Sequence, residues 1–293
     1  MRKQFAKTIE AVMDIDKRLV TILGDIGVFG FRNVFSKYPE RTYNIGICEQ
    51  AVTSLAAGLS KVDLIPVVHS IAPFVVERCF EQLKDDFGYQ KLRGNFVSVG
   101  ASYDYAGLGC THHCPGDIAL LKSIPGMEII IPGTPAEFDT LFKETYNNNK
   151  PTYFRLSEHE NKETQLVQFG KANVIRKGKL GTLIVVGPFL DTALESVNEL
   201  DLTILYYTTI APFDNLTLKK NICNEKIIIC EPYYLGALTN DIHLALQGKA
   251  ISIKFIGIPH IFLSNYGSYR DQNNFLGLNS ESIKNQIIEF LNG

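Results

Sequence analysis

Hydrophobic residues in this chain form short continuous runs that alternate with segments in which apolar residues recur at helical spacing. Continuous apolar runs are typical of strands buried on both faces of a parallel sheet, and helical spacing indicates amphipathic helices. We expect strands at residues 19–23, 64–71, 95–99, 127–132, 152–156, 182–186, 202–206, 226–230 and 251–256. We expect helices at residues 1–13, 74–87, 135–147, 190–199, 236–246 and 280–291. This alternation predicts an α/β protein with parallel sheets covered by helices on both faces.

A polar segment at residues 157–170 interrupts the alternation. Such segments commonly mark domain boundaries because few contacts cross them. We therefore predict two three-layer αβα domains. The first, residues 1–158, contains a parallel sheet; residues 159–170 are a linker; the second and smaller domain is residues 171–293.

Composition narrows the class of protein. The chain has 293 residues, 45% of them hydrophobic, with a formal net charge of −2 and a pI near 6.3. Lysine and arginine form no long run, so neither nucleic acid nor an anionic membrane is expected as a partner. No apolar run reaches transmembrane length. The six cysteines lie mostly within apolar patterns, which favours a reducing cytoplasm over a disulfide framework.

Glu49 occupies an unusual position in the first domain. Tyr43, Ile45 and Ile47 alternate with polar or small residues, and apolar residues at helical spacing follow at 51–59, so Glu49 lies where a short strand leads into a helix. A carboxylate in the first turn of a helix is stabilised by the helix dipole, which is its commonest role. The neighbours of Glu49 are small or apolar, however, and a carboxyl group deprived of water can share a proton with a ring nitrogen.

The segment Cys110-Thr-His-His-Cys114 contains two thiols and two imidazoles. Zinc is disfavoured because adjacent histidines diverge, the cysteine spacing is unusual and no second ligand pair follows. An imidazole that donates a hydrogen bond or transfers a proton is the better interpretation.

Five motifs follow one another along the chain: Gly46-Ile-Cys-Glu-Gln50, Phe74-x3-Arg78-x-Phe80-Glu81-Gln82, Gly109-Cys-Thr-His-His113, Asp117-Ile-Ala-Leu120 and Ser123-Ile-Pro-Gly-Met127. Together they resemble the C-terminal half of transketolases, and most closely the split-gene transketolases in which that half is a separate subunit. They resemble less closely 1-deoxyxylulose-5-phosphate synthases and 2-oxoacid dehydrogenase β subunits. The resemblance implies a pyrimidine-binding domain followed by a transketolase C-terminal-type domain.

The resemblance also implies an enzyme that transfers a two-carbon ketol unit between sugars with thiamine diphosphate. A synthase-like or dehydrogenase-like β subunit, and a non-catalytic subunit that retains the fold, are the alternatives. Glu49 would hydrogen-bond the pyrimidine ring of the cofactor and favour the tautomer that removes a proton from the thiazolium carbon. Phe74 would stack on the pyrimidine, and Arg78 and Asp25 would complete the cofactor site.

On the substrate side, the resemblance assigns His112 to the substrate hydroxyls, with His113 assisting. His69 would lie on the active-site side of the sheet, although a core histidine is an equal alternative. Arg155 would bind a substrate phosphate through its guanidinium group. Other phosphate contacts of transketolases are missing, which leaves open the sugar and whether it is phosphorylated.

The chain lacks the Gly-Asp-Gly motif, followed by Asn, with which this family binds Mg²⁺ and the cofactor diphosphate. The resemblance therefore implies a second, diphosphate-binding N-terminal subunit that carries the Mg²⁺ ligands, self-association of the present subunit and an α2β2 assembly. The glycine turn at 24–30 and the loop at 100–116 would lie at this interface. We expect Phe29, Phe31 and Leu108 to be exposed there in an isolated subunit.

Overall fold

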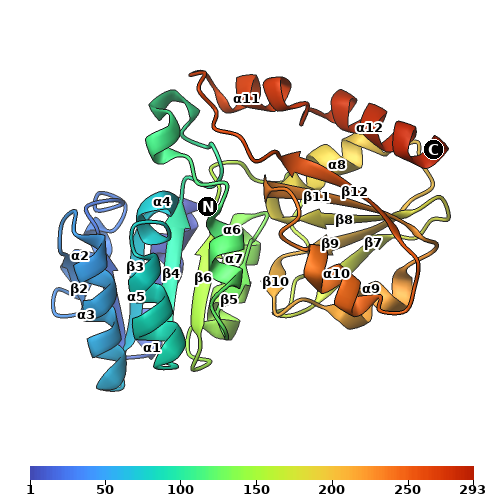
Figure 1. The fold of residues 1–293 in the computed structure, drawn as a ribbon. Coiled ribbons are helices and arrows are strands. Elements are labelled where there is room, and N and C mark those ends of the chain that lie inside the picture. Colours follow the sequence, from blue (N-terminus) through green and yellow to red (C-terminus); the bar gives the residue numbers. More distant parts are fainter.

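The computed structural model describes all residues 1–293 and contains two α/β units, each with a central sheet between layers of helices (Figure 1). The predicted fold class is confirmed. The continuous apolar runs form the strands, and β1 (Leu19–Leu23), β3 (Ile65–Ile71) and β8 (Thr182–Val186) are buried at every position. Burial on both faces is what such runs predict, because a helix layer covers each side of the sheet.

The first sheet has seven strands in the order β10-β5-β6-β4-β3-β1-β2. All pairs are parallel except β10 with β5. The other strands are β2 (Thr42–Asn44), β4 (Gly94–Val99), β5 (Glu128–Ile130), β6 (Pro151–Arg155) and β10 (Thr209–Ala211). The helices are α1 (Arg2–Ile15), α2 (Arg32–Lys37), α3 (Glu49–Lys61), α4 (Ala72–Val75), α5 (Phe80–Gln82), a π-helix (Leu83–Tyr89), α6 (Asp117–Lys122) and α7 (Pro135–Thr145).

The second sheet has five strands in the order β12-β11-β8-β9-β7, and only β7 is antiparallel to its neighbour. Its remaining strands are β7 (Ala172–Arg176), β9 (Thr203–Tyr207), β11 (Lys226–Tyr234) and β12 (Ser252–Ile258). The helices are α8 (Leu190–Ser196), α9 (Asn215–Asn221), α10 (Thr239–Ala245), α11 (Tyr269–Leu276) and α12 (Ser280–Asn292). None of the chain's helices is long and apolar enough to cross a membrane.

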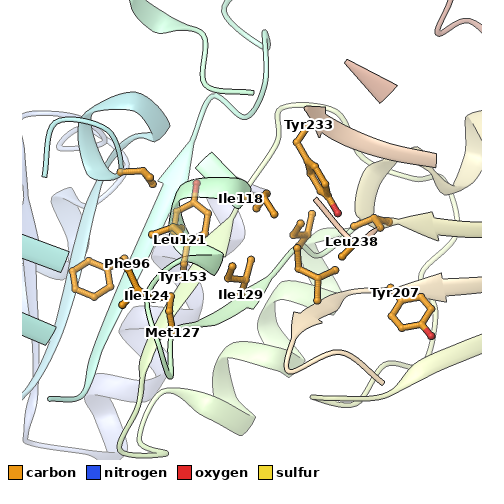
Figure 2. Packing of buried hydrophobic residues seen from close by; sticks show 14 of the residues in the cluster. Phe96, Ile118, Leu121, Ile124, Met127, Ile129, Tyr153, Tyr207, Tyr233 and Leu238 are labelled. Atoms are coloured by element: carbon orange, nitrogen blue, oxygen red, sulfur yellow. The ribbon is translucent and has the colours of Figure 1, made fainter. Parts of the chain in front are cut away.

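Residues 156–171, which contain neither helix nor strand, connect the two sheets. One strand crosses this division, because β10 leaves the second unit and pairs with β5 at the edge of the first sheet. The hydrophobic core also continues across it. Figure 2 shows Ile118 and Ile129 of the first unit packed near Tyr233 and Leu238 of the second, within one buried cluster. These shared contacts fix the two units against each other.

The prediction of a single helix at residues 74–87 is wrong in detail. The chain forms α4, a turn, α5 and then the π-helix. Within the turn the Arg78 amide donates to the Pro73 carbonyl and the Cys79 thiol to the Phe74 carbonyl, so the regular helical hydrogen bonds are interrupted. This break determines how Phe74 and Arg78 are presented to the candidate site.

Candidate active site

Glu49 is the first residue of α3 and its carboxyl group is buried, with 4% of the residue exposed. One carboxylate oxygen, Oε2, accepts a hydrogen bond from Arg78 Nη1 at 2.8 Å. The other, Oε1, is buried and has no hydrogen-bond partner. Leaving a buried carboxylate oxygen unpaired is costly, and native structures rarely do so without a reason. This oxygen is therefore suited to accept a hydrogen bond from a ligand.

Three further residues connect to Glu49 through direct contacts. The Arg78 guanidinium carbon lies 4.1 Å from the centre of the Phe74 ring, a cation–π contact. The Phe74 ring in turn meets the His112 ring edge to face, with 5.4 Å between their centres. The structure thus brings together Glu49, Phe74, Arg78 and His112, which the motifs place far apart along the chain.

The two adjacent histidines have different surroundings. His112 ends a short 3₁₀ turn, Cys110–His112, and its half-buried ring lies with Nδ1 3.0 Å from Thr111 Oγ1. His113 is 7% exposed, and its Nε2 is buried without a partner. Burial, with the nearby His112, lowers the pKa of His113. His113 lines a separate cavity of about 80 Å³ beside the second unit, so only His112 contacts the Glu49 group.

The cysteines of this segment do not form a metal site. Cys114 is buried and donates to Glu77 Oε1 at 3.5 Å, whereas Cys110 is exposed. No group of three or more histidine, cysteine, aspartate or glutamate side chains in the chain could hold a metal ion.

Asp25 and His69 line another cavity, of about 750 Å³, formed by the start of α1 and the glycine turn. His69 is buried on β3, and its Nδ1 donates to the Val97 carbonyl oxygen at 2.7 Å. Burial lowers the pKa of His69 to about 4, so the ring is neutral at physiological pH. None of Glu49, Phe74, Arg78 and His112 lines this cavity.

The walls of this larger cavity are rich in positive charge. Four cationic residues line it: Arg2, Lys3, Lys7 and Arg32. Glu10 and Asp25 are its acidic residues. The excess of cations suits an anionic group, because opposite charges are stabilised in a partly enclosed space.

The structure does not support the phosphate-binding role expected of Arg155. Arg155 is 1% exposed, and its Nε donates to Asp117 Oδ2 at 2.7 Å. Its Nη2 donates to Ser102 Oγ and to the Cys114 carbonyl oxygen. The guanidinium group therefore ties the loop after β4 to the sheet and is not open to a substrate. Its buried partner is Asp117, to which sequence reasoning assigned no role beyond its place in a motif.

The glycine turn, the loop after β4 and the segment around Glu49 each carry exposed apolar side chains. Phe29 and Leu108 are exposed, at 80% and 55%, but Phe31 is buried at 2%, so the prediction for Phe31 is wrong. Phe31 points into the core, where its ring packs against Phe5. Further exposed apolar side chains flank Glu49 in the chain: Tyr43, Ile45, Ile47 and Leu55.

Comparisons with known proteins agree with the motifs. Residues 1–163 match the family described as the pyrimidine-binding domain of transketolase. A protein of Rhodococcoides fascians, named only as an uncharacterized 33.6 kDa protein in the fasciation locus, is 33% identical over 98% of this chain and 93% of its own length. One of the subunits of the apulose-4-phosphate transketolase of Phocaeicola vulgatus is 27% identical, covering 99% of this chain and 97% of its own.

Among solved structures, a split-gene transketolase described as an inactive β4 tetramer superposes with a TM-score of 0.89 at 23% identity, covering 99% of this chain and 98% of that one. This similarity establishes the fold along the whole length of the chain. With the matched domain and the relatives of equal length, it leads to one conclusion: the chain belongs to the transketolase family, in the form in which the pyrimidine-binding and C-terminal domains make up a separate subunit.

Proposed function

We propose that this chain is the pyrimidine-binding subunit of a thiamine-diphosphate-dependent transketolase that transfers a two-carbon ketol unit between sugar substrates. The observation that carries the proposal is the buried, unpartnered Oε1 of Glu49, next to an oxygen already paired with Arg78. A carboxylate arranged in this way has one acceptor position left for a ring nitrogen that carries a proton.

Thiamine diphosphate, when bound, supplies a thiazolium carbon that acts as the nucleophile toward a ketose carbonyl. Glu49 would accept the hydrogen bond of the pyrimidine ring through Oε1. Arg78 holds the other carboxylate oxygen, and so it keeps the carboxyl group in one orientation. Phe74, half-buried between Arg78 and His112, offers an aromatic surface for the pyrimidine.

His112 would act on the substrate. Its imidazole is half-buried and is not held by any carboxylate, so it is free to donate a hydrogen bond to a substrate hydroxyl or to exchange a proton with it. We expect His112→Ala to lower kcat by about a hundredfold while thiamine diphosphate still binds, since the residue acts on the substrate. His243→Ala, at an exposed position in α10, is the matched control and should leave kcat unchanged.

The larger cavity supports an anionic substrate. Asp25 and His69 line it together with four cationic residues, and we propose that it receives the charged end of a sugar phosphate or sugar acid. This assignment replaces the role expected of Arg155, which is buried elsewhere.

We further propose that the subunit works only with a diphosphate-binding partner, in an α2β2 assembly located in the cytoplasm. The chain lacks the Gly-Asp-Gly motif with which this family binds the Mg²⁺ of the cofactor diphosphate, so the ligands would come from the partner. Ile45, Ile47 and Leu55 are exposed close to Glu49 in the chain, Phe29 is exposed in the glycine turn at 24–30, and Leu108 is exposed in the loop at 100–116. Apolar side chains exposed around a site are typical of a subunit interface.

Calorimetry and a ketol-transfer assay test the proposal. The purified chain is titrated with thiamine diphosphate and Mg²⁺ before and after addition of a candidate partner that carries the Gly-Asp-Gly motif. We expect tight binding and transfer only in the mixture. Tight binding and transfer by the chain alone, or no binding in any mixture, would contradict it.

Two variants separate loss of the interface from loss of the fold. Ile47→Asp places a charge on the exposed surface beside Glu49 and should weaken assembly with the partner at least tenfold. Ile15→Asp introduces the same charge at another exposed isoleucine, 79% exposed at the end of α1, and should assemble like the wild type.

A further inference from the structure

The loop that carries His112, residues 100–114, has little regular structure of its own. It contains two 3₁₀ turns, Ala106–Leu108 and Cys110–His112, and the Cys114 amide closes it by donating to the Ser102 carbonyl oxygen at 2.7 Å. A loop of this kind holds one shape only if other parts of the molecule restrain it. Where those restraints come from therefore decides how well His112 is positioned.

The base of the loop is fixed by its own domain and by β11. Arg155 donates to Ser102 Oγ and to the Cys114 carbonyl oxygen, and Ser102 Oγ donates to the Pro232 carbonyl oxygen. These contacts hold the two ends of the loop. They do not reach the turn that bears His112.

The outer part of the loop is covered by a segment of the second domain. We call this segment the strap; it comprises residues 259–276, from the end of β12 through α11. In Figure 1 it rises from the second sheet and passes beside the loop between β4 and α6. The Tyr103 hydroxyl donates to Asn273 Oδ1, and the Tyr103 and Tyr269 rings lie 5.1 Å apart. Tyr269 also stacks on His159, with 3.5 Å between ring centres.

Tyr266 of the strap reaches the turn that bears His112. Gly109 has φ +77° and ψ −169°, which side chains disfavour, and a Cβ built on it would lie 2.8 Å from Tyr266 Cε1. The tyrosine ring thus fills the place of the missing side chain. The Gly109 carbonyl oxygen accepts a hydrogen bond from the His112 amide at 3.0 Å. The Tyr266 ring therefore packs against the residue that holds the His112 backbone.

The contact between Tyr266 and Gly109 contributes little to the stability of the fold. Tyr266 is 73% exposed, whereas side chains that build the core of a domain are buried. An exposed ring held against a glycine beside a candidate catalytic residue is better explained by control of the turn than by stability.

We propose that the strap is a positioning element, through which the second domain fixes the turn that presents His112, with Tyr266 as its contact residue. The importance of His112 rests on the proposed function; the restraint of the turn by the strap does not. The second domain then contributes to the active site without touching the substrate.

Hydrogen–deuterium exchange on the purified chain tests the restraint directly. Tyr266→Ala should speed exchange of the His112 and His113 amides by about tenfold, because the turn loses its outer contact. Tyr266→Phe keeps the ring and should restore the wild-type rates. Phe275→Ala removes another exposed aromatic of the strap, at 62% exposure, and should leave these amides unchanged. Wild-type exchange in Tyr266→Ala, or equal acceleration in Phe275→Ala, would overturn the proposal.

Tyr103→Phe is an independent second variant. It keeps the buried ring and removes only the hydroxyl that donates to Asn273, so the loop should exchange faster while the fold is retained.

In the reconstituted enzyme, Tyr266→Ala should lower kcat about tenfold with unchanged affinity for thiamine diphosphate. If the mixture shows no ketol transfer, the proposed function fails, but the exchange rates still decide the role of the strap.

Discussion

Two arginine–carboxylate pairs in the first domain have nearly the same geometry and opposite surroundings. Arg78 Nη1 lies 2.8 Å from Glu49 Oε2, and Arg155 Nε lies 2.7 Å from Asp117 Oδ2. The side chains of the first pair are 37% and 5% exposed, whereas those of the second are 1% and 0% exposed. The first pair opens toward solvent on its arginine side, and the second is enclosed.

The two pairs differ in whether both oxygens of the carboxylate accept a hydrogen bond. Asp117 Oδ2 accepts from both Arg155 and Tyr153, and Asp117 Oδ1 accepts from the Ile118 amide. Glu49 Oε1 accepts from nothing. A buried carboxylate with every acceptor used supports the structure, whereas one with an unused acceptor is arranged for a ligand.

The largest effect expected from this comparison is on stability. Arg155→Ala removes one partner of the enclosed pair and leaves the Asp117 carboxylate buried without compensation, so the free energy of unfolding should fall by about 3–5 kcal/mol. Urea unfolding followed by circular dichroism measures it. A loss below about 1 kcal/mol would mean that Arg155 is not a structural residue.

Acid unfolding tests a further buried ionisable group of the first domain, His69 on β3. Its pKa is lowered to about 4 by burial. As the pH falls below 6.5 the unfolded chain takes up a proton that the folded chain accepts only near pH 4. Stability due to this group is therefore lost across that window, by at most about 3 kcal/mol.

His69→Gln keeps a donor for the Val97 carbonyl oxygen and cannot titrate, so the variant should lose less stability than the wild type between pH 6.5 and 4. Burial raises the pKa of Asp104 to about 7 and of Glu231 to about 8, which has the opposite sign, but both groups are present in each protein. The difference between the two unfolding curves therefore reports His69. Parallel curves across the window would exclude it.

The smallest effect is expected at the open pair. Arg78→Gln removes a charge whose side chain is 37% exposed, so solvent screens much of the interaction and unfolding should become easier by only about 1 kcal/mol. The same unfolding experiment as for Arg155→Ala applies. If Arg78→Gln costs as much as Arg155→Ala, the two pairs contribute equally to stability and the contrast between them fails.

Sequence reasoning predicted the fold and named both residues of the open pair as cofactor-site residues, because both leave local patterns, but it did not predict that they pair. Strands such as Leu19–Leu23 are continuous apolar runs, and Glu49, Phe74, Arg78 and His112 lie within motifs. The enclosed pair left a weaker signal. Arg155 stands in the run Thr152-Tyr-Phe-Arg-Leu156, where a polar residue on a strand buried on both faces must itself be buried. Its partner Asp117 was assigned only a place in a motif.

The elements that join the two domains were harder to foresee. β10 spans three residues, Thr209–Ala211, and belongs to the first sheet only through pairing with β5. α11 has a mostly polar sequence, although Ser268 and Asp271 form a capping box that marks its start. Short elements fixed by distant contacts have no periodicity of their own, so the strap could not be inferred before the structure.

The central claim is that Glu49 Oε1 serves the cofactor, and proton exchange at the thiazolium carbon of thiamine diphosphate tests it most directly. Glu49→Gln keeps the size of the side chain but cannot share a proton with the pyrimidine ring. In the complex reconstituted with the partner subunit, exchange should slow by about a hundredfold or more, whereas the exposed control His243→Ala should keep the wild-type rate. Exchange at the wild-type rate in Glu49→Gln would contradict the claim.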